Sequence, residues 1–70
     1  MQSLSEVLAG ESCVIKWMFG NPKILEFMNR YDIREGSEIR VFEQQRDWMI
    51  IGKDDVRIAI GSEVAERIKV

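Results

Sequence analysis

The chain has 70 residues, of which 46% are hydrophobic and 31% are charged, and its formal net charge is −2 at pH 7. A chain of this length forms one small domain, and its apolar content excludes an intrinsically disordered protein. The acidic balance and the scattered basic residues disfavour a nucleic-acid-binding protein, which normally carries a basic patch. We therefore expect a single domain over residues 1–70 that does not bind nucleic acid.

One cysteine, Cys13, and the lack of histidine limit the redox and metal chemistry of the chain. A single cysteine cannot form an internal disulfide, which fits a reducing compartment. No apolar run approaches the roughly 20 residues that span a bilayer. The first residues also lack the pattern of a secretion signal. These features predict a cytoplasmic protein that is not inserted in a membrane.

The first two predicted elements are a short helical turn and a strand. Ser3 and Glu6 have the spacing of a capping box, which favours a single helical turn after Ser3. Residues 12–19 predict the first strand, although apolar side chains occupy both of its faces. Either the strand is buried on both faces, or a bulge near Lys16 and Trp17 switches the buried face. We favour the bulge, which places Trp17 at the surface.

Residues 21–31 carry the pattern of a capped helix. Asn21 is a favoured N-cap residue, and Pro22 suits the first helical position. Asp32 follows the last turn, where aspartate can adopt the left-handed conformation that ends a helix. We therefore expect one helix inserted between the first and second strands. Its apolar face carries Ile24, Leu25, Phe27, Met28 and Tyr31, and its opposite face carries Glu26 and Arg30 at i,i+4 spacing.

The second half of the chain predicts short strands joined by tight turns. Alternating apolar and polar residues predict strands near residues 38–42 and 56–60, with a further strand at residues 48–51. Gly36 allows the turn before the first of these strands, and residues 44–47 form a short hairpin loop. A single helical turn and a last short strand complete the chain. Five short strands with one inserted helix predict a small, bent, mainly β barrel.

No set of residues in the sequence predicts a catalytic, cofactor or metal site. Cys13 has no histidine to activate it, and the serines stand in cap or turn contexts. Asp54 and Asp55 match no calcium-binding loop, and the glycines are too dispersed for a phosphate-binding loop. We expect a protein that is not an enzyme and that has no cofactor and no metal ligands. An exposed aromatic at Trp17 or Trp48, beside mixed charges, favours a protein–protein contact.

Several segments carry an order of residues that is found elsewhere: Leu8-Ala9-Gly10-Glu11, Cys13-Val14-Ile15, Glu35-Gly36-Ser37-Glu38-Ile39-Arg40-Val41, Arg57-Ile58-Ala59-Ile60, and Glu63 to Val70. Met28, Tyr31 and Ile33 lie between them at matching positions. Over nearly the whole chain, this order resembles the ferrous iron transport protein A (FeoA) family. The resemblance implies a five-stranded SH3-like barrel with a helix between the first two strands.

The resemblance also implies a function. Members of the family are small cytosolic accessory proteins of bacterial ferrous iron uptake, thought to act on FeoB, a membrane permease with a cytosolic GTP-binding domain. On this interpretation the chain docks on FeoB through an apolar patch, for which the candidate residues are Trp17, Phe19, Glu26 and Arg30. The family has no universal metal-ligand motif, so the resemblance assigns no metal residues. Direct binding of iron and the oligomeric state stay open.

Two alternative functions stay open beside this one. The same fold resembles the C-terminal domain of iron-dependent repressors, so the chain could instead be a stand-alone regulatory domain that senses a metal or a peptide. The absence of histidine counts against the metal version of that hypothesis. An RNA-binding small barrel is the third hypothesis, and the acidic charge of the chain opposes it.

The chain departs from the family pattern at three places. Asp32 stands where a glycine usually follows the helix, and Glu35 stands where a proline is common. The hairpin loop at residues 44–47 is shorter than is usual in the family. Asp32 can still end the helix, so the expected fold is unchanged. The shorter loop puts in question any partner contact that family members make there.

Overall fold

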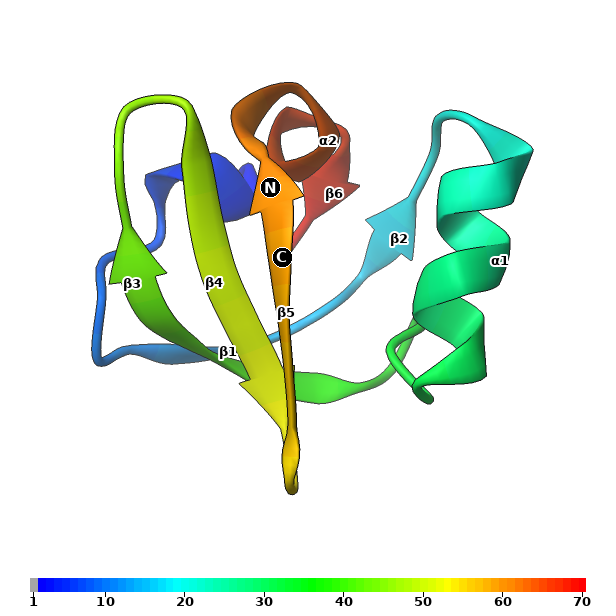
Figure 1. Cartoon of the computed structure of the whole chain (residues 1–70), viewed down its shortest axis with the longest axis horizontal. Coiled ribbons are helices and arrows are strands. Elements are labelled where there is room, and N and C mark those ends of the chain that lie inside the picture. The colour runs from blue at the N-terminus through cyan, green and yellow to red at the C-terminus, as the bar shows by residue number, and fades with distance from the viewer. Residues whose placement is uncertain (1) are drawn as a thin grey trace.

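Six strands in two sheets and two helices make up the computed structural model, which describes residues 2–70 (Figure 1). An antiparallel sheet of four strands has the order β1-β3-β4-β5. These strands are β1 (Ser12–Val14), β3 (Glu38–Gln44), β4 (Trp48–Lys53) and β5 (Val56–Gly61). The second sheet pairs β2 (Trp17–Met18) with β6 (Ile68–Lys69). The helical elements are the 3-10 turn η1 (Leu4–Glu6), α1 (Pro22–Arg30) and α2 (Ser62–Glu66). The prediction of a mainly β fold with one inserted helix is confirmed.

The predicted first strand, residues 12–19, is divided into β1 and β2, which is why six strands replace the five predicted. β1 pairs with β3 in the large sheet, whereas β2 pairs with β6 in the small one. Ile15 is buried between them, while Val14 and Trp17 on either side are exposed. The buried face therefore switches next to Lys16, as predicted. The switch arises because the chain leaves one sheet for the other, rather than bulging within one strand.

The core is built on the inner face of the four-stranded sheet. Alternate residues of β3, β4 and β5 point inward, and no inward apolar side chain in the middle of these strands is more than 7% exposed: Ile39, Val41, Met49, Ile51, Ile58 and Ile60. Each such side chain contributes about 1.5–3 kcal/mol by leaving water. The rest of the chain covers this face with Leu4, Val7, Ile15, Met28, Ile33, Ala65 and Ile68.

A β-bulge at Phe42 shapes the outer face of the same sheet. The register between β3 and β4 shifts between Val41 and Glu43, so Phe42 has no partner residue on β4. A Cβ atom at Gly52 would lie 2.7 Å from Cε2 of the Phe42 ring and 2.5 Å from the Val56 carbonyl oxygen. The sequence predicted a strand that ends at residue 51, whereas β4 continues through Gly52 to Lys53. Gly52 lies within β4, where the missing side chain leaves room for the ring.

α1 begins and ends as the sequence predicts. The Asn21 Oδ1 atom accepts a hydrogen bond from the Lys23 N–H at 2.8 Å, and Pro22 is the first helical residue. Asp32 has a φ of 64° and follows the last turn. Figure 1 shows α1 at one side of the molecule, next to β2 and away from β4 and β5.

The apolar face of α1 is covered only in part. Met28 is fully buried, whereas Phe27 and Tyr31 are exposed and meet edge to face, with ring centroids 5.2 Å apart. Ile24 and Leu25 are partly buried and line a groove, and Ile24 also packs against the edge of the core. An open groove separates these two side chains from α2, so the chain itself does not cover the whole apolar face of the helix.

Candidate functional site

An aromatic pair, Trp17 and Phe19, is exposed on the β2 side of the molecule, with 45% and 46% of the two side chains accessible. Their rings meet edge to face, with centroids 6.2 Å apart. Pairing of β2 with β6 sets Trp17 opposite Lys69, and the Phe19 N–H donates to the Arg67 carbonyl oxygen at 3.1 Å. The Lys69 Nζ lies 5.9 Å from the Phe19 ring centroid, within cation–π range. The backbone hydrogen bonds around β2 thus fix the position of two aromatic side chains that are exposed to solvent.

A groove of about 310 Å³ begins beside Phe19 and runs between α1 and α2. Its apolar lining comes from Phe19, Ile24, Leu25, Val64 and Ile68, and its other lining residues are Gly20, Asn21, Glu63 and Arg67. The Arg67 Nη1 donates to the Glu63 carbonyl oxygen at 3.2 Å, which holds the arginine along one wall. A groove that combines apolar walls with polar groups can take part in binding, because the walls bury apolar surface and the polar groups orient the bound group.

The four residues predicted to bind a partner divide into two pairs. Trp17 and Phe19 lie together, and Phe19 lines the groove. Glu26 and Arg30 are exposed on α1, on the side of the helix away from Met28, and do not line the groove. Among the described residues, no ion pair joins Glu26 to Arg30. The structure therefore brings the aromatic pair to a groove and leaves the charged pair outside it.

The sequence did not reveal the second wall of the groove, which α2 provides. A helix of five residues has too little periodicity to show which of its side chains face a neighbour. Val64 and Arg67 reach the groove only because β6 brings the end of the chain back beside β2. The one signal in the sequence was the large number of apolar residues on α1, of which Met28 alone is fully buried in the structure.

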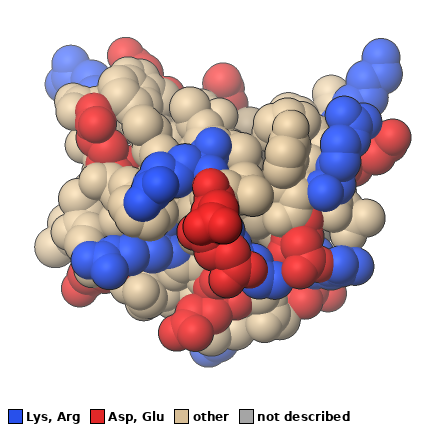
Figure 2. Space-filling view, turned by 60° about the horizontal axis from the view of Figure 1, so that its bottom comes forward, with Lys and Arg blue, Asp and Glu red and all other residues tan. Residues whose placement is uncertain are grey.

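Charged side chains of both signs are interspersed on the face that Figure 2 shows, with no large area of one sign. Within residues 2–70, no group of three or more histidine, cysteine, aspartate or glutamate side chains is placed to hold a metal ion.

Cys13 is half-buried, and its burial, followed by the charge of Glu11, raises the pKa of its thiol. A raised pKa favours the unreactive thiol over the thiolate.

None of the helices in residues 2–70 has both the length and the apolar character needed to cross a membrane.

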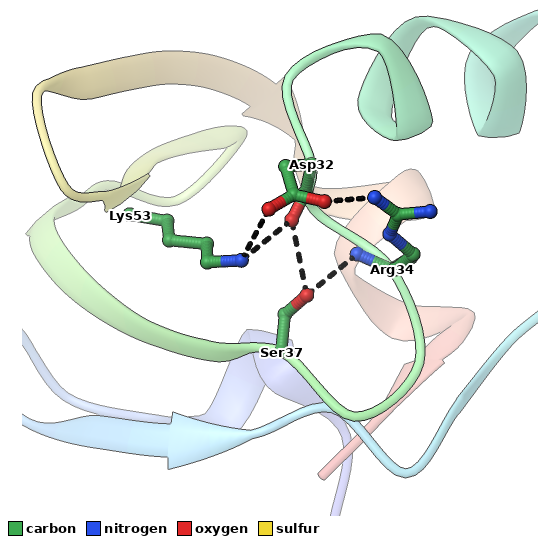
Figure 3. Close-up of polar contacts among 4 residues, drawn as sticks. All are labelled: Asp32, Arg34, Ser37 and Lys53. Atoms are coloured by element: carbon green, nitrogen blue, oxygen red, sulfur yellow. Dashed lines mark hydrogen bonds and ion pairs between the residues drawn. The ribbon is translucent and has the colours of Figure 1, made fainter.

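A cluster of ion pairs ties the end of α1 to β4 (Figure 3). The Asp32 carboxylate accepts a hydrogen bond from the Lys53 Nζ at 2.8 Å and pairs with the Arg34 guanidinium. The Asp32 carbonyl oxygen accepts from the Lys53 Nζ and from the Ser37 Oγ, each at 3.1 Å. The hydrogen bond from Lys53, and then that from Arg34, lowers the pKa of Asp32 to about 2. Because the carboxylate and carbonyl already have partners in the chain, this cluster is structural.

Comparison with known proteins places the chain among relatives of similar length. The FeoA domain model matches residues 2–70. Among solved structures, the chain is similar to the crystal structure of an iron uptake regulatory protein (FeoA), with 26% sequence identity and a TM-score of 0.82. That similarity covers 96% of this chain and 91% of the other. No curated protein matches the chain.

Proposed function

The chain belongs to the FeoA domain family, and on that premise we propose that it is an accessory protein of ferrous iron uptake that acts by binding a protein partner. The FeoA domain is a small accessory domain and not an enzyme family, which confirms the prediction of a protein that is not an enzyme. The similar solved structure is named an iron uptake regulatory protein, which supports the same role for this chain. The proposed partner is the FeoB permease, on its cytosolic side.

The observation that carries this proposal is the exposed aromatic pair beside the groove, which we call the Trp17–Phe19 patch. Aromatic side chains bury a large area on binding and concentrate at the energetic centres of protein interfaces. A partner side chain seated in the groove would contact Phe19 and the apolar walls that α1 and α2 provide. Glu26 and Arg30, outside the groove, would then lie at the rim, where charges set orientation and association rate more than affinity.

Regulation follows if the partner is bound better in one of its states. A protein that binds two states with different affinity shifts the equilibrium between them by that difference. We propose that the chain distinguishes the nucleotide states of the GTP-binding domain of FeoB. It would thereby couple iron uptake to the GTPase cycle without performing chemistry of its own.

The test is an NMR titration of the labelled chain with the cytosolic domain of its cognate permease, with and without GTP. We expect amide shifts confined to β2, α1 and the groove, with an affinity that changes with nucleotide. If no signal moves at concentrations of about 1 mM, where weak contacts still register, docking on the soluble domain is rejected. Titration with ferrous iron would then test the alternative of a stand-alone sensor domain.

The chain offers a matched control for this experiment. Trp17 and Trp48 are 45% and 39% exposed, but Trp48 lies on β4, in the other sheet. We expect Trp17→Ala to weaken binding of the permease domain by about tenfold or more, because centrally buried tryptophans dominate interface energies. Trp48→Ala should leave the affinity unchanged. An equal loss in both variants would show that the docking site is elsewhere.

A further inference from the structure

Arg67 gives the groove between α1 and α2 a positively charged wall, and several contacts hold this residue in place. Its N–H donates to the Val64 carbonyl oxygen at 3.0 Å, and its carbonyl oxygen accepts from the Phe19 N–H at 3.1 Å. The Arg67 Nη1 donates to the Glu63 carbonyl oxygen at 3.2 Å. A Cβ atom at Gly20 would lie 3.4 Å from the Arg67 Cδ, so the arginine stem lies close against this glycine. The guanidinium is therefore held at the groove by both its backbone and its side chain.

The charge of Arg67 is not compensated within residues 2–70, where both ion pairs involve Asp32. Glu63 is the other charged residue that lines the groove. Its Oε1 lies 3.3 Å from the point that a Cβ atom at Gly61 would occupy, at the N-terminal end of α2. Arg67 follows the opposite end of the same helix. A guanidinium has several N–H donors, and those not bonded to Glu63 can bind a carboxylate from outside the chain.

The groove offers apolar side chains beside this charge. Ile24 and Leu25 come from α1, Val64 from α2 and the buried Ile68 from β6, and Phe19 directly follows β2. The volume of about 310 Å³ lies at the small end of the range for ligand sites, which is about 300–1,000 Å³. A groove of this size takes a side chain of a partner rather than a whole helix.

A ligand with an apolar group and a carboxylate matches both parts of the groove. The apolar group gains free energy by leaving water, and arginine–carboxylate pairs form strong, often bidentate hydrogen bonds. We propose that the groove binds a segment of a protein partner in which aspartate or glutamate stands next to a large apolar residue. The apolar side chain enters the groove, and the carboxylate pairs with Arg67. This inference rests on the proposed function of binding a protein partner and names the chemistry of the segment that docks.

The occupant is a polypeptide segment rather than a free small molecule. Phe19 lines the groove and also belongs to the Trp17–Phe19 patch, so the groove continues into an exposed aromatic surface. A polypeptide can place one side chain in the groove and lay its neighbours over the aromatic pair, whereas a molecule that only fills the groove leaves Trp17 uncovered. Lys69 lies beside Phe19 and, in the described chain, has no carboxylate partner either. A segment with acidic residues therefore complements the charge along this path.

The probe that tests the inference is a library of short linear peptides displayed on phage and selected on the full chain. We expect enriched peptides to share an acidic residue next to a large aliphatic or aromatic residue. When a synthetic copy of such a peptide is added to the labelled chain, the NMR amide shifts should be largest at Gly20, Ile24, Val64 and Arg67.

The contact between the carboxylate and Arg67 is tested by changing both partners. Replacing the acidic residue of the peptide by its amide should weaken binding to the wild type by about fivefold. The same replacement should have little effect on binding to Arg67→Gln, because the guanidinium is already absent. Arg67→Glu should reject the acidic peptides and bind copies with lysine in place of the acidic residue. Arg46→Glu makes the same change of charge at an exposed residue outside the groove and is the matched control, with binding retained.

The inference is overturned if no peptide is enriched above background or if the enriched peptides lack an acidic residue. It is overturned equally if the amide replacement weakens binding to the wild type and to Arg67→Gln by the same factor. Arg67 is exposed, so its substitutions leave the core intact.

These results are separate from the test of FeoB as the partner. Failure of the peptides leaves docking of FeoB on the aromatic pair standing, because titration with the permease domain tests that docking directly. If the peptides bind as expected while the permease domain moves no signal, FeoB is rejected as the partner and the assigned chemistry of the groove is supported.

Discussion

The inner face of the four-stranded sheet is closed by other parts of the chain, whereas the apolar face of α1 is covered only in part. Inward residues such as Ile51 and Val41 have no accessible surface, but on α1 only Met28 reaches that state. The sheet is covered by helical turns, by the second sheet and by the loop after α1, while α1 stands at one side with a groove between it and α2. The comparison shows that an apolar pattern identifies a face that avoids water without identifying what covers it.

The largest expected effect comes from truncating the closed face. Ile51 has no accessible surface, so Ile51→Ala removes buried methyl groups and leaves a cavity. We expect a loss of about 2–5 kcal/mol in the free energy of unfolding. Urea denaturation followed by circular dichroism measures it. A loss below about 1 kcal/mol would show that the site collapses around the smaller side chain and that the sheet core is not tightly packed.

The same substitution on the open face should cost much less. Ile24 on α1 is partly buried and lines the groove, so Ile24→Ala removes fewer contacts, and alanine is the better helix former. We expect a loss of roughly 1 kcal/mol or less in the same denaturation experiment. Equal losses for Ile24→Ala and Ile51→Ala would break the comparison, because they would mean that α1 is as well covered as the sheet.

The smallest effect concerns the cluster that joins the two regions. The pKa of Asp32 is about 2 in the folded chain, below its ordinary value of 3.8, so folding is favoured while the carboxylate is charged. This contribution is fully present above about pH 4 and is lost as the pH falls towards 2. We expect the Tm of the wild type to exceed that of Asp32→Asn at pH 5, with the difference shrinking as the pH falls towards 2. Because the side chain is exposed, added salt should also reduce the difference. A difference in Tm that does not change with pH would show that the ion pairs contribute no stability.

Asp32 also illustrates what a local signal can predict. The sequence indicated that an aspartate after the helix could replace the usual glycine, and its φ of 64° confirms that conformation. The same local reasoning predicted the Asn21 cap and the change of buried face near Lys16. It did not predict that Lys53, 21 residues later, would bond to the carboxylate of Asp32. That contact depends on β4 passing beside the end of α1.

The candidate sites show the same division. Exposure of Trp17 was predicted from strand alternation, since a conflict between two apolar faces occurs within a few residues. The groove, the bulge that lays Phe42 over Gly52, and the open edge of β5 were not predicted. Each depends on two segments far apart in the sequence, and a single strand carries no mark of being the last in its sheet.

The sequence by itself determined the inserted helix, its cap, and the apolar sides of α1, β3 and β5, because these follow from steric and hydrogen-bonding preferences within one or two turns of chain. The tertiary structure alone decided which apolar sides are covered. Pairing of β2 with β6 set α2 across the groove from α1, and within residues 2–70 the sheet order gives β5 a single neighbouring strand, β4. Those outcomes depend on contacts between distant segments, whose free energy is gained only when the whole chain has folded.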